Sequence, residues 1–141
     1  MLKINSKLPD IETSIFAVMS KLANETGAIN LSQGFPDWQC SEKLIDLVNE
    51  YMVKGYNQYA PMPGVPKLRE ALANKVNSLY RSSVIIDEIT ITAGATQALY
   101  TAIATVINDD DEVIVFEPAY DSYVPAILMN KGIPKGTVIK S

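Results

Sequence analysis

The chain has 141 residues and a net charge of −4, from 12 Lys and Arg against 16 Asp and Glu, and 48% of its residues are hydrophobic. This length and composition are compatible with one soluble globular unit. The chain has no His and a single Cys, Cys40, which excludes Ser-His-Asp catalysis, His-ligated zinc, an internal disulfide and a Cys-rich metal site. The acidic balance offers nucleic acid no basic surface.

The first ten residues, MLKINSKLPD, lack the apolar core of a signal peptide. No stretch approaches the ~18 apolar residues of a membrane span. A lone cysteine is compatible with a reducing compartment. These features predict a soluble, cytoplasmic protein that binds neither nucleic acid nor membrane.

An amphipathic helix is expected near the N-terminus, followed by a loop over residues 30–40. Thr13 or Ser14 can cap the helix, and Gly27 stands where such a helix ends. The apolar residues that define its period are Ile15, Val18, Met19 and Leu22.

Two more helices are expected before the middle of the chain. Ser41 can cap one that ends at Gly55, and Pro66 suits the first position of the next. Residues 56–66 between them hold three prolines and predict an irregular, stiff connection. The last of these helices is expected to bury a stripe of Leu68, Leu72, Val76 and Leu79.

After residue 87 the pattern changes to alternating strands and helices. The expected order is strand 89–93, turn 94–96, helix 97–107, charged turn 108–111, strand 113–116 covered on both faces, helix 121–130 and a strand from residue 137. This order predicts parallel strands with right-handed crossovers. Since two or three strands are too few to complete such a sheet, the chain is expected to be incomplete.

Two places at the carboxyl edge of this sheet could bind a ligand. At Gly94-Ala95-Thr96, backbone N–H groups at a helix N-terminus and a hydroxyl converge on one spot, which suits a phosphate. An ordinary turn is the alternative, because no Walker or GxGxxG pattern is present. Tyr120 leaves the next strand and could stack on a flat ring, or it could pack on the following helix.

Four segments in a fixed order make a more specific pattern: INLSQGFPD, NQYAPMPGVPKLREAL, ITITAGATQALYTAI and DEVIVFEPAYDSYVPAI. Together they resemble the N-terminal portion of fold-type I pyridoxal-phosphate aminotransferases of class I/II, most of all the methionine and kynurenine aminotransferase-like branch. The resemblance extends from about residue 8 to residue 139. It implies an α/β fold, with N-terminal helices before the start of a mainly parallel sheet that has flanking helices.

The resemblance also implies a division of the chain. Residues 1–50 would form an N-terminal arm and helices that contribute to the small domain and the substrate loop. Residues 51–141 would form the first, incomplete part of the large domain that binds pyridoxal 5′-phosphate. The parent would be a homodimer whose active sites are shared between its subunits.

By the same resemblance, Gly94, Ala95 and Thr96 would hold the cofactor phosphate and Tyr120 would stack on its pyridine ring. Tyr59 would reach the phosphate in the neighbouring subunit; from the residues alone, a tyrosine packed on its own subunit is the simpler interpretation.

The substrate loop supplies three further candidates. Gly34 would lie beside the substrate carboxylate, while Phe35 and Trp38 would favour an apolar or aromatic side chain. A partly exposed loop residue is the alternative for Trp38.

The motif that carries the Schiff-base lysine is absent from these residues, so no catalytic residue is expected among them. None of the lysines considered lies in a matching position: Lys54, Lys67, Lys75, Lys131, Lys135 and Lys140. The expected function is transfer of the amino group of an L-amino acid, methionine or an aromatic or kynurenine-like one, to a 2-oxo acid, with the fragment inactive alone. The alternatives are a β-lyase or cyclopropane-forming synthase of the same fold, or a non-catalytic interaction fragment.

Overall fold

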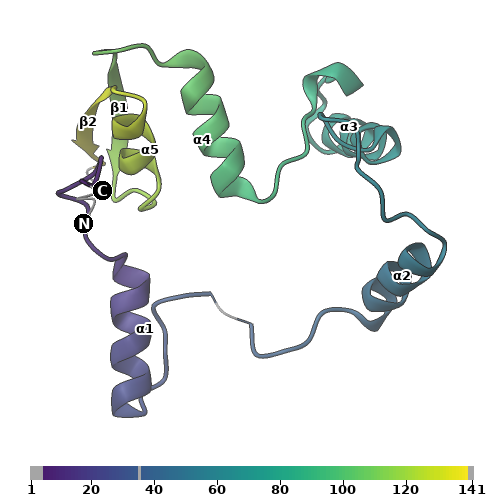
Figure 1. Ribbon diagram of the computed structural model, residues 1–141, viewed down its shortest axis with the longest axis horizontal. Helices are drawn as coiled ribbons and strands as arrows, with labels where there is room; N and C mark the ends of the chain where they lie inside the picture. Colours follow the sequence, from purple (N-terminus) through teal and green to yellow (C-terminus); the bar gives the residue numbers. More distant parts are fainter. Residues whose placement is uncertain (1–4, 35, 140–141) are drawn as a thin grey trace. The chain divides into compact units, whose positions relative to one another are not determined.

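The computed structural model describes residues 5–34 and 36–139, which group into two compact units (Figure 1). Unit 1 combines the described parts of residues 1–34 and 93–141, and unit 2 those of residues 35–92. No helix among the described residues combines the length and the apolar character needed to cross a membrane.

Unit 1 begins with α1, Ile15–Thr26, which confirms the expected N-terminal helix. The Ser14 hydroxyl accepts a hydrogen bond from the Phe16 amide at 3.3 Å, so this serine is the N-cap. Gly27 ends the helix with φ 67°, a left-handed conformation that costs glycine little.

The rest of unit 1 is a strand and helix alternation. Its elements are α4 (Ala95–Val106), β1 (Glu112–Glu117), α5 (Tyr123–Met129) and β2 (Ile133–Val138). The two strands pair in parallel, with Glu112 opposite Ile133 and Glu117 opposite Val138, as the alternation predicts. Helix α4 begins two residues earlier than expected, and β2 begins four residues earlier.

The core of unit 1 lies between α5 and the sheet. Ile127 on α5 is 2% exposed, and Val115 on β1 is 5% exposed. The expectation that β1 is covered on both faces is wrong, because Ile114 and Phe116 are 67% and 62% exposed. Successive strand residues point to opposite faces, and in the described part of the chain only the face that bears Val115 is covered.

The turn that joins α4 to β1 is held by its own carboxylates. The backbone and side-chain amides of Asn108 donate to Asp111 Oδ2 at 2.8 and 3.1 Å. These hydrogen bonds, the backbone one first, lower the pKa of Asp111 from its ordinary value. Lys131 pairs with Asp109 at 2.6 Å, so the charged turn is bonded as well as solvated.

Unit 2 contains α2 (Glu42–Val53), α3 (Pro66–Tyr80) and a short 3₁₀ turn, η1 (Ile86–Glu88). Ser41 occupies the N-cap position of α2 without a side-chain capping bond, and Pro66 opens α3 as expected.

The expected buried stripe on α3 is wrong. Leu68 and Leu79 are 45% and 62% exposed, whereas Arg69 and Ala73 are buried. The buried face is the one that packs against η1. The backbone carbonyl of Ile86 lies there and accepts a hydrogen bond from Arg69, which a leucine could not donate.

The expected strand over residues 89–93 is also not formed. Ile89 has extended backbone angles, but a strand needs a hydrogen-bonded neighbour, and the sheet in the described residues consists of β1 and β2. The Ile91 amide donates instead to the carbonyl of Pro63 at 2.9 Å. The β-type sequence therefore yields an extended segment that is attached to a loop.

Candidate functional site

The first component of the site is the turn that opens α4, residues 94–96, here called the phosphate turn. Gly94 is the N-cap with φ 97°, and a Cβ placed on it would meet nothing within 4 Å. Ala95 and Thr96 form the exposed first turn, whose N–H groups have no acceptor inside an α-helix. No acidic residue lies in that turn. The positive end of the helix dipole is therefore open to an anion.

A side chain fixes the backbone next to this turn. The amide of Ala93 donates to Oε1 of Gln97 at 2.6 Å, one helical turn further on. This bond holds the approach to the helix and leaves the Thr96 side chain exposed.

The second component is Tyr120, which follows the carboxyl end of β1. Its ring centroid lies 6.2 Å from that of Phe16 and 6.0 Å from that of Tyr123 on α5. The residue is nevertheless 48% exposed and lines a hollow of about 490 Å³. The ring is thus held in place by neighbouring aromatics while a large part of it stays accessible.

The phosphate turn and the segment after Tyr120 come together in unit 1. Thr96 and Ser122 line the same hollow of about 190 Å³, which lies where α4 packs against α5. Figure 1 shows the beginning of α4 and the end of β1 at the same end of this unit. Both candidates therefore lie at the carboxyl edge of the sheet, as the topology predicts.

Ser122 is a residue that sequence reasoning missed. Its Oγ is buried and has no hydrogen-bond partner among the described residues. Its place two residues after Tyr120 and next to α5 is the one signal in the sequence that could have marked it.

Helix α1 is tied to the same region. The Ser14 hydroxyl donates to the Asp121 carboxylate, next to Tyr120. Asp121 and Glu117 both line the hollow of Tyr120, so two carboxyl groups border this hollow. An anionic group would therefore be favoured at the phosphate turn and disfavoured beside Asp121.

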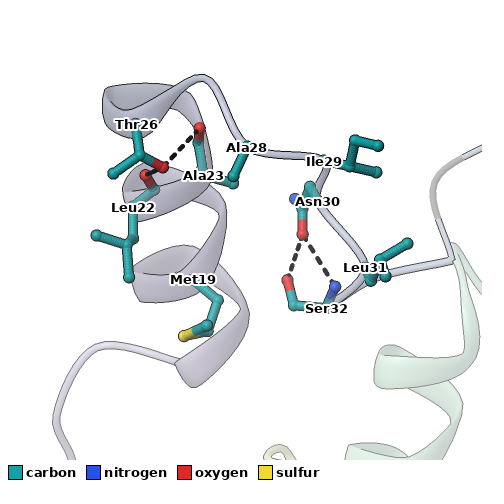
Figure 2. Close-up of a pocket in the computed structure, with 9 residues that line it drawn as sticks. All are labelled: Met19, Leu22, Ala23, Thr26, Ala28, Ile29, Asn30, Leu31 and Ser32. Carbon is teal, nitrogen blue, oxygen red and sulfur yellow. Dashed lines mark hydrogen bonds between the residues drawn. The ribbon is translucent and has the colours of Figure 1, made fainter.

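The segment that leads to Gly34 folds back along α1 (Figure 2). Asn30 Oδ1 accepts from the amide and the hydroxyl of Ser32 at 3.0 and 2.6 Å, and its Nδ2 donates to Ser20 at 3.0 Å. Gly34 follows two residues later, exposed and with open space around it. The groove beside this segment holds about 500 Å³ and is lined by Met19, Leu22, Ala23, Thr26, Ala28, Ile29, Asn30, Leu31 and Ser32.

The remaining candidates lie outside unit 1 or outside the described residues. Trp38 and Tyr59 belong to unit 2, and their side chains are 74% and 101% exposed. Phe35 lies outside the described residues.

Comparison with known proteins decides the family. The sequence pattern of "Aminotransferase class I and II" matches residues 26–135. The chain belongs to this family. It is 52% identical over 131 residues to methionine aminotransferase of Escherichia coli K12, covering 92% of this chain and 34% of that protein. It is 36% identical over 129 residues to kynurenine–oxoglutarate transaminase of Dictyostelium discoideum, covering 90% and 30%.

Solved structures of family members confirm the expected fold class. The crystal structure of E. coli YbdL, identified as a methionine aminotransferase, superposes with a TM-score of 0.93 at 49% identity, covering 99% of this chain and 37% of that one. N-succinyldiaminopimelate aminotransferase of Mycobacterium tuberculosis gives a TM-score of 0.89 at 33% identity, with 99% and 36% coverage. The chain spans about a third of the length of the curated relatives it matches.

Proposed function

We propose that this chain is the N-terminal part of a cytoplasmic aminotransferase that uses pyridoxal 5′-phosphate. The enzyme moves the amino group of an L-amino acid to a 2-oxo acid. Membership of the family supports the class of reaction, and the names of the relatives favour methionine or a kynurenine-like substrate. The observation that carries the proposal is the exposed first turn of α4, which holds no acidic residue and lies at the same end of unit 1 as the end of β1.

The residues present fit this cofactor. The first turn of α4 offers N–H groups and a hydroxyl to a phosphate, with no acid in that turn. The half-exposed ring of Tyr120 offers a flat apolar surface to a pyridine. When bound, pyridoxal phosphate supplies an electron sink for the carbon that carries the amino group.

Each group of this chain then has a binding or orienting role. The first-turn amides of α4 and the Thr96 hydroxyl donate to the phosphate and fix one end of the cofactor. Tyr120 stacks on the ring and sets its plane. Gly34 lies beside the substrate carboxylate, and Tyr59 donates to the phosphate held by the partner subunit. Fixing the reactants in this way removes much of the entropic part of the barrier.

The proposal includes a domain assignment and a dimer. Residues 1–50 contribute an arm, helices and the substrate loop to the small domain, and residues 51–141 begin the large domain. Phe35 and Trp38 form an apolar wall of the substrate site. The Schiff-base lysine belongs to the part of the enzyme beyond these residues.

The test uses the full-length enzyme that contains this chain, loaded with pyridoxal phosphate. L-methionine or L-kynurenine is supplied with and without a 2-oxo acid, and the amino acids, 2-oxo acids and ammonia are quantified. The expected result is a new amino acid formed in equal amount to the 2-oxo acid produced, and only when both substrates are present. Ammonia released from the amino acid without an acceptor would identify a lyase and contradict the proposal.

A further inference from the structure

The tyrosine proposed to stack on the cofactor ring lies in an irregular loop of unit 1. Strand β1 ends at Glu117 and α5 begins at Tyr123, so Tyr120 belongs to neither element. The carbonyl of Tyr120 accepts a hydrogen bond from the Tyr123 amide at 3.1 Å, but this backbone bond leaves several side-chain rotamers open. The orientation of the Tyr120 ring therefore depends on its side-chain neighbours.

Two of the contacts to this loop come from the beginning of α1. The Ser14 hydroxyl donates to the carboxylate of Asp121, the residue after Tyr120. The ring centroid of Phe16 lies 6.2 Å from that of Tyr120, with 41° between the ring planes. Tyr123 contacts the same ring from α5, with 6.0 Å between the centroids and 70° between the planes. Both separations lie in the range of favourable aromatic pairs, so the ring of Tyr120 has neighbours from two helices.

The helix cap holds the two contacts from α1 in a fixed relation to each other. The Ser14 hydroxyl accepts from the Phe16 amide at 3.3 Å. The Ser14 carbonyl accepts from the amides of Ala17 and Val18 at 3.0 and 3.1 Å. Ser14 and Phe16 therefore belong to one closed turn, and both side chains are half-buried.

We propose that Ser14 and Phe16 are positioning residues for the ring of Tyr120. Through direct contacts within unit 1, the beginning of α1 holds this ring in the plane in which it stacks on the cofactor. The inference rests on the proposed function, because it assumes that Tyr120 stacks on pyridoxal phosphate.

The experiment uses the full-length enzyme and two measurements of its bound cofactor. Equilibrium dialysis gives the dissociation constant of pyridoxal phosphate. Circular dichroism in the absorption band of the cofactor reports how the groups around its ring are oriented. Thermal unfolding of each variant shows that it is folded.

Substitutions of Ser14 separate the contact with Asp121 from the helix cap. Ser14→Asp keeps an acceptor for the Phe16 amide, because Asp caps helices as well as Ser does, but it cannot donate to Asp121 and places two carboxylates together. The dissociation constant should rise by about three- to tenfold, and the dichroism of the cofactor should change. Ser14→Thr keeps both the acceptor and the donor and should behave as the wild type. Lys21→Ala, which removes a solvated ion pair later in α1, is the control and should change neither measurement.

A second set of variants tests whether the effect passes through the Tyr120 ring. Phe16→Leu keeps an apolar side chain but removes the aromatic contact, so it should also weaken cofactor binding. In a Tyr120→Ala background the ring is gone, and Ser14→Asp and Phe16→Leu should then cause no further loss.

The inference is overturned if either folded variant binds the cofactor as the wild type does, or if the losses persist in the Tyr120→Ala background. Should Ser14→Asp fail to fold, Phe16→Leu decides. A Tyr120→Ala enzyme with wild-type cofactor affinity would overturn the stacking role and this inference together. A loss of affinity in Tyr120→Ala that neither Ser14→Asp nor Phe16→Leu shares would overturn the inference alone.

Discussion

Two regions that carry candidate residues are built in opposite ways. At the carboxyl edge of β1, side chains of unit 1 hold one another: Tyr120 lies against two aromatic rings, and Thr96 shares a hollow with Ser122. In the loop of residues 56–66, the backbone is attached at Pro63 and Gly64, but the Tyr59 side chain is 101% exposed.

The difference shows what each region needs in order to function. At the carboxyl edge of β1, contacts within unit 1 hold Tyr120 and Thr96 in place. Cofactor binding by these residues should therefore respond to changes in the core of unit 1. The loop of residues 56–66 is stiffened by its prolines, and the side chain of Tyr59 is fully exposed. A stiff loop loses little conformational entropy when it docks on another surface. The exposure of Tyr59 is therefore compatible with the proposed contact with a partner subunit.

The largest expected effect concerns the core beneath the first region. Ile127→Ala should lower the free energy of unfolding of the full-length enzyme by about 2–5 kcal/mol, because a 2% exposed side chain leaves a cavity. Leu128→Ala, at a 39% exposed neighbour, should cost much less. Denaturant unfolding measures both, and equal losses would contradict the core described for unit 1.

Next in size is the phosphate turn. Thr96→Val keeps the volume but removes a hydroxyl from a charged acceptor, so cofactor affinity should fall by roughly 1.5–3 kcal/mol, about ten- to a hundred-fold. Thr101→Val, at an exposed position later in α4, is the matched control and should change nothing. Titration with the cofactor decides: an unchanged affinity in Thr96→Val would make residues 94–96 an ordinary turn.

A comparable or smaller effect is expected at Tyr120. Stacking needs the ring and not the hydroxyl, so Tyr120→Ala should weaken cofactor binding by roughly 1–3 kcal/mol while Tyr120→Phe is mild. The two dissociation constants are compared with that of the wild-type enzyme. An equal loss of cofactor affinity in both variants would show that the hydroxyl of Tyr120 makes the contact, and it would refute the stacking role.

The second region is tested with hybrid dimers of the full-length enzyme. One subunit carries Tyr59→Phe and the other Thr96→Val. If Tyr59 acts on the partner's phosphate, both defects fall on one site, and the hybrid keeps about half of the wild-type activity. Activity equal to the average of the two single mutants would show that Tyr59 acts within its own subunit and would break the contrast between the regions.

The smallest effect is expected at the turn between α4 and β1. The hydrogen bonds from Asn108 lower the pKa of Asp111 below its ordinary value of 3.8. The ionised carboxylate therefore stabilises the fold above that pH, and this contribution disappears as the pH falls below it. The melting temperatures of the wild type and Asp111→Asn should differ more at pH 7 than at pH 3. The same difference at both pH values would contradict a stabilising role of the ionised Asp111 carboxylate.

Features encoded by neighbouring residues were predictable from the sequence. Helix α1 has its cap at Ser14 and its end at Gly27, and the parallel order of β1 and β2 follows from the alternation of elements. The location of the beginning of α4 and the end of β1 at the same end of unit 1 followed from the same topology.

Features that depend on distant partners were not predictable. The burial of Arg69 requires the carbonyls of Ile86 and Ile89, about twenty residues away. The spacing of apolar residues along the helix does not predict these partners. The segment 89–93 has the composition of a strand, yet pairing is a property of two segments and not of one. The hollow that joins Ser122 to Thr96 exists only once α5 has packed on α4.

The hydrogen bond from Ser14 to Asp121 joins residues that are 107 positions apart. During synthesis on the ribosome, at about 5–20 residues per second, Ser14 is made roughly 5–20 seconds before Asp121. During that interval α1, which carries Val18 and Leu22, lacks the hydrogen bond from Ser14 to Asp121. The hydrogen bond that joins the first helix of the chain to the segment after β1 can therefore form only once residue 121 has been synthesised.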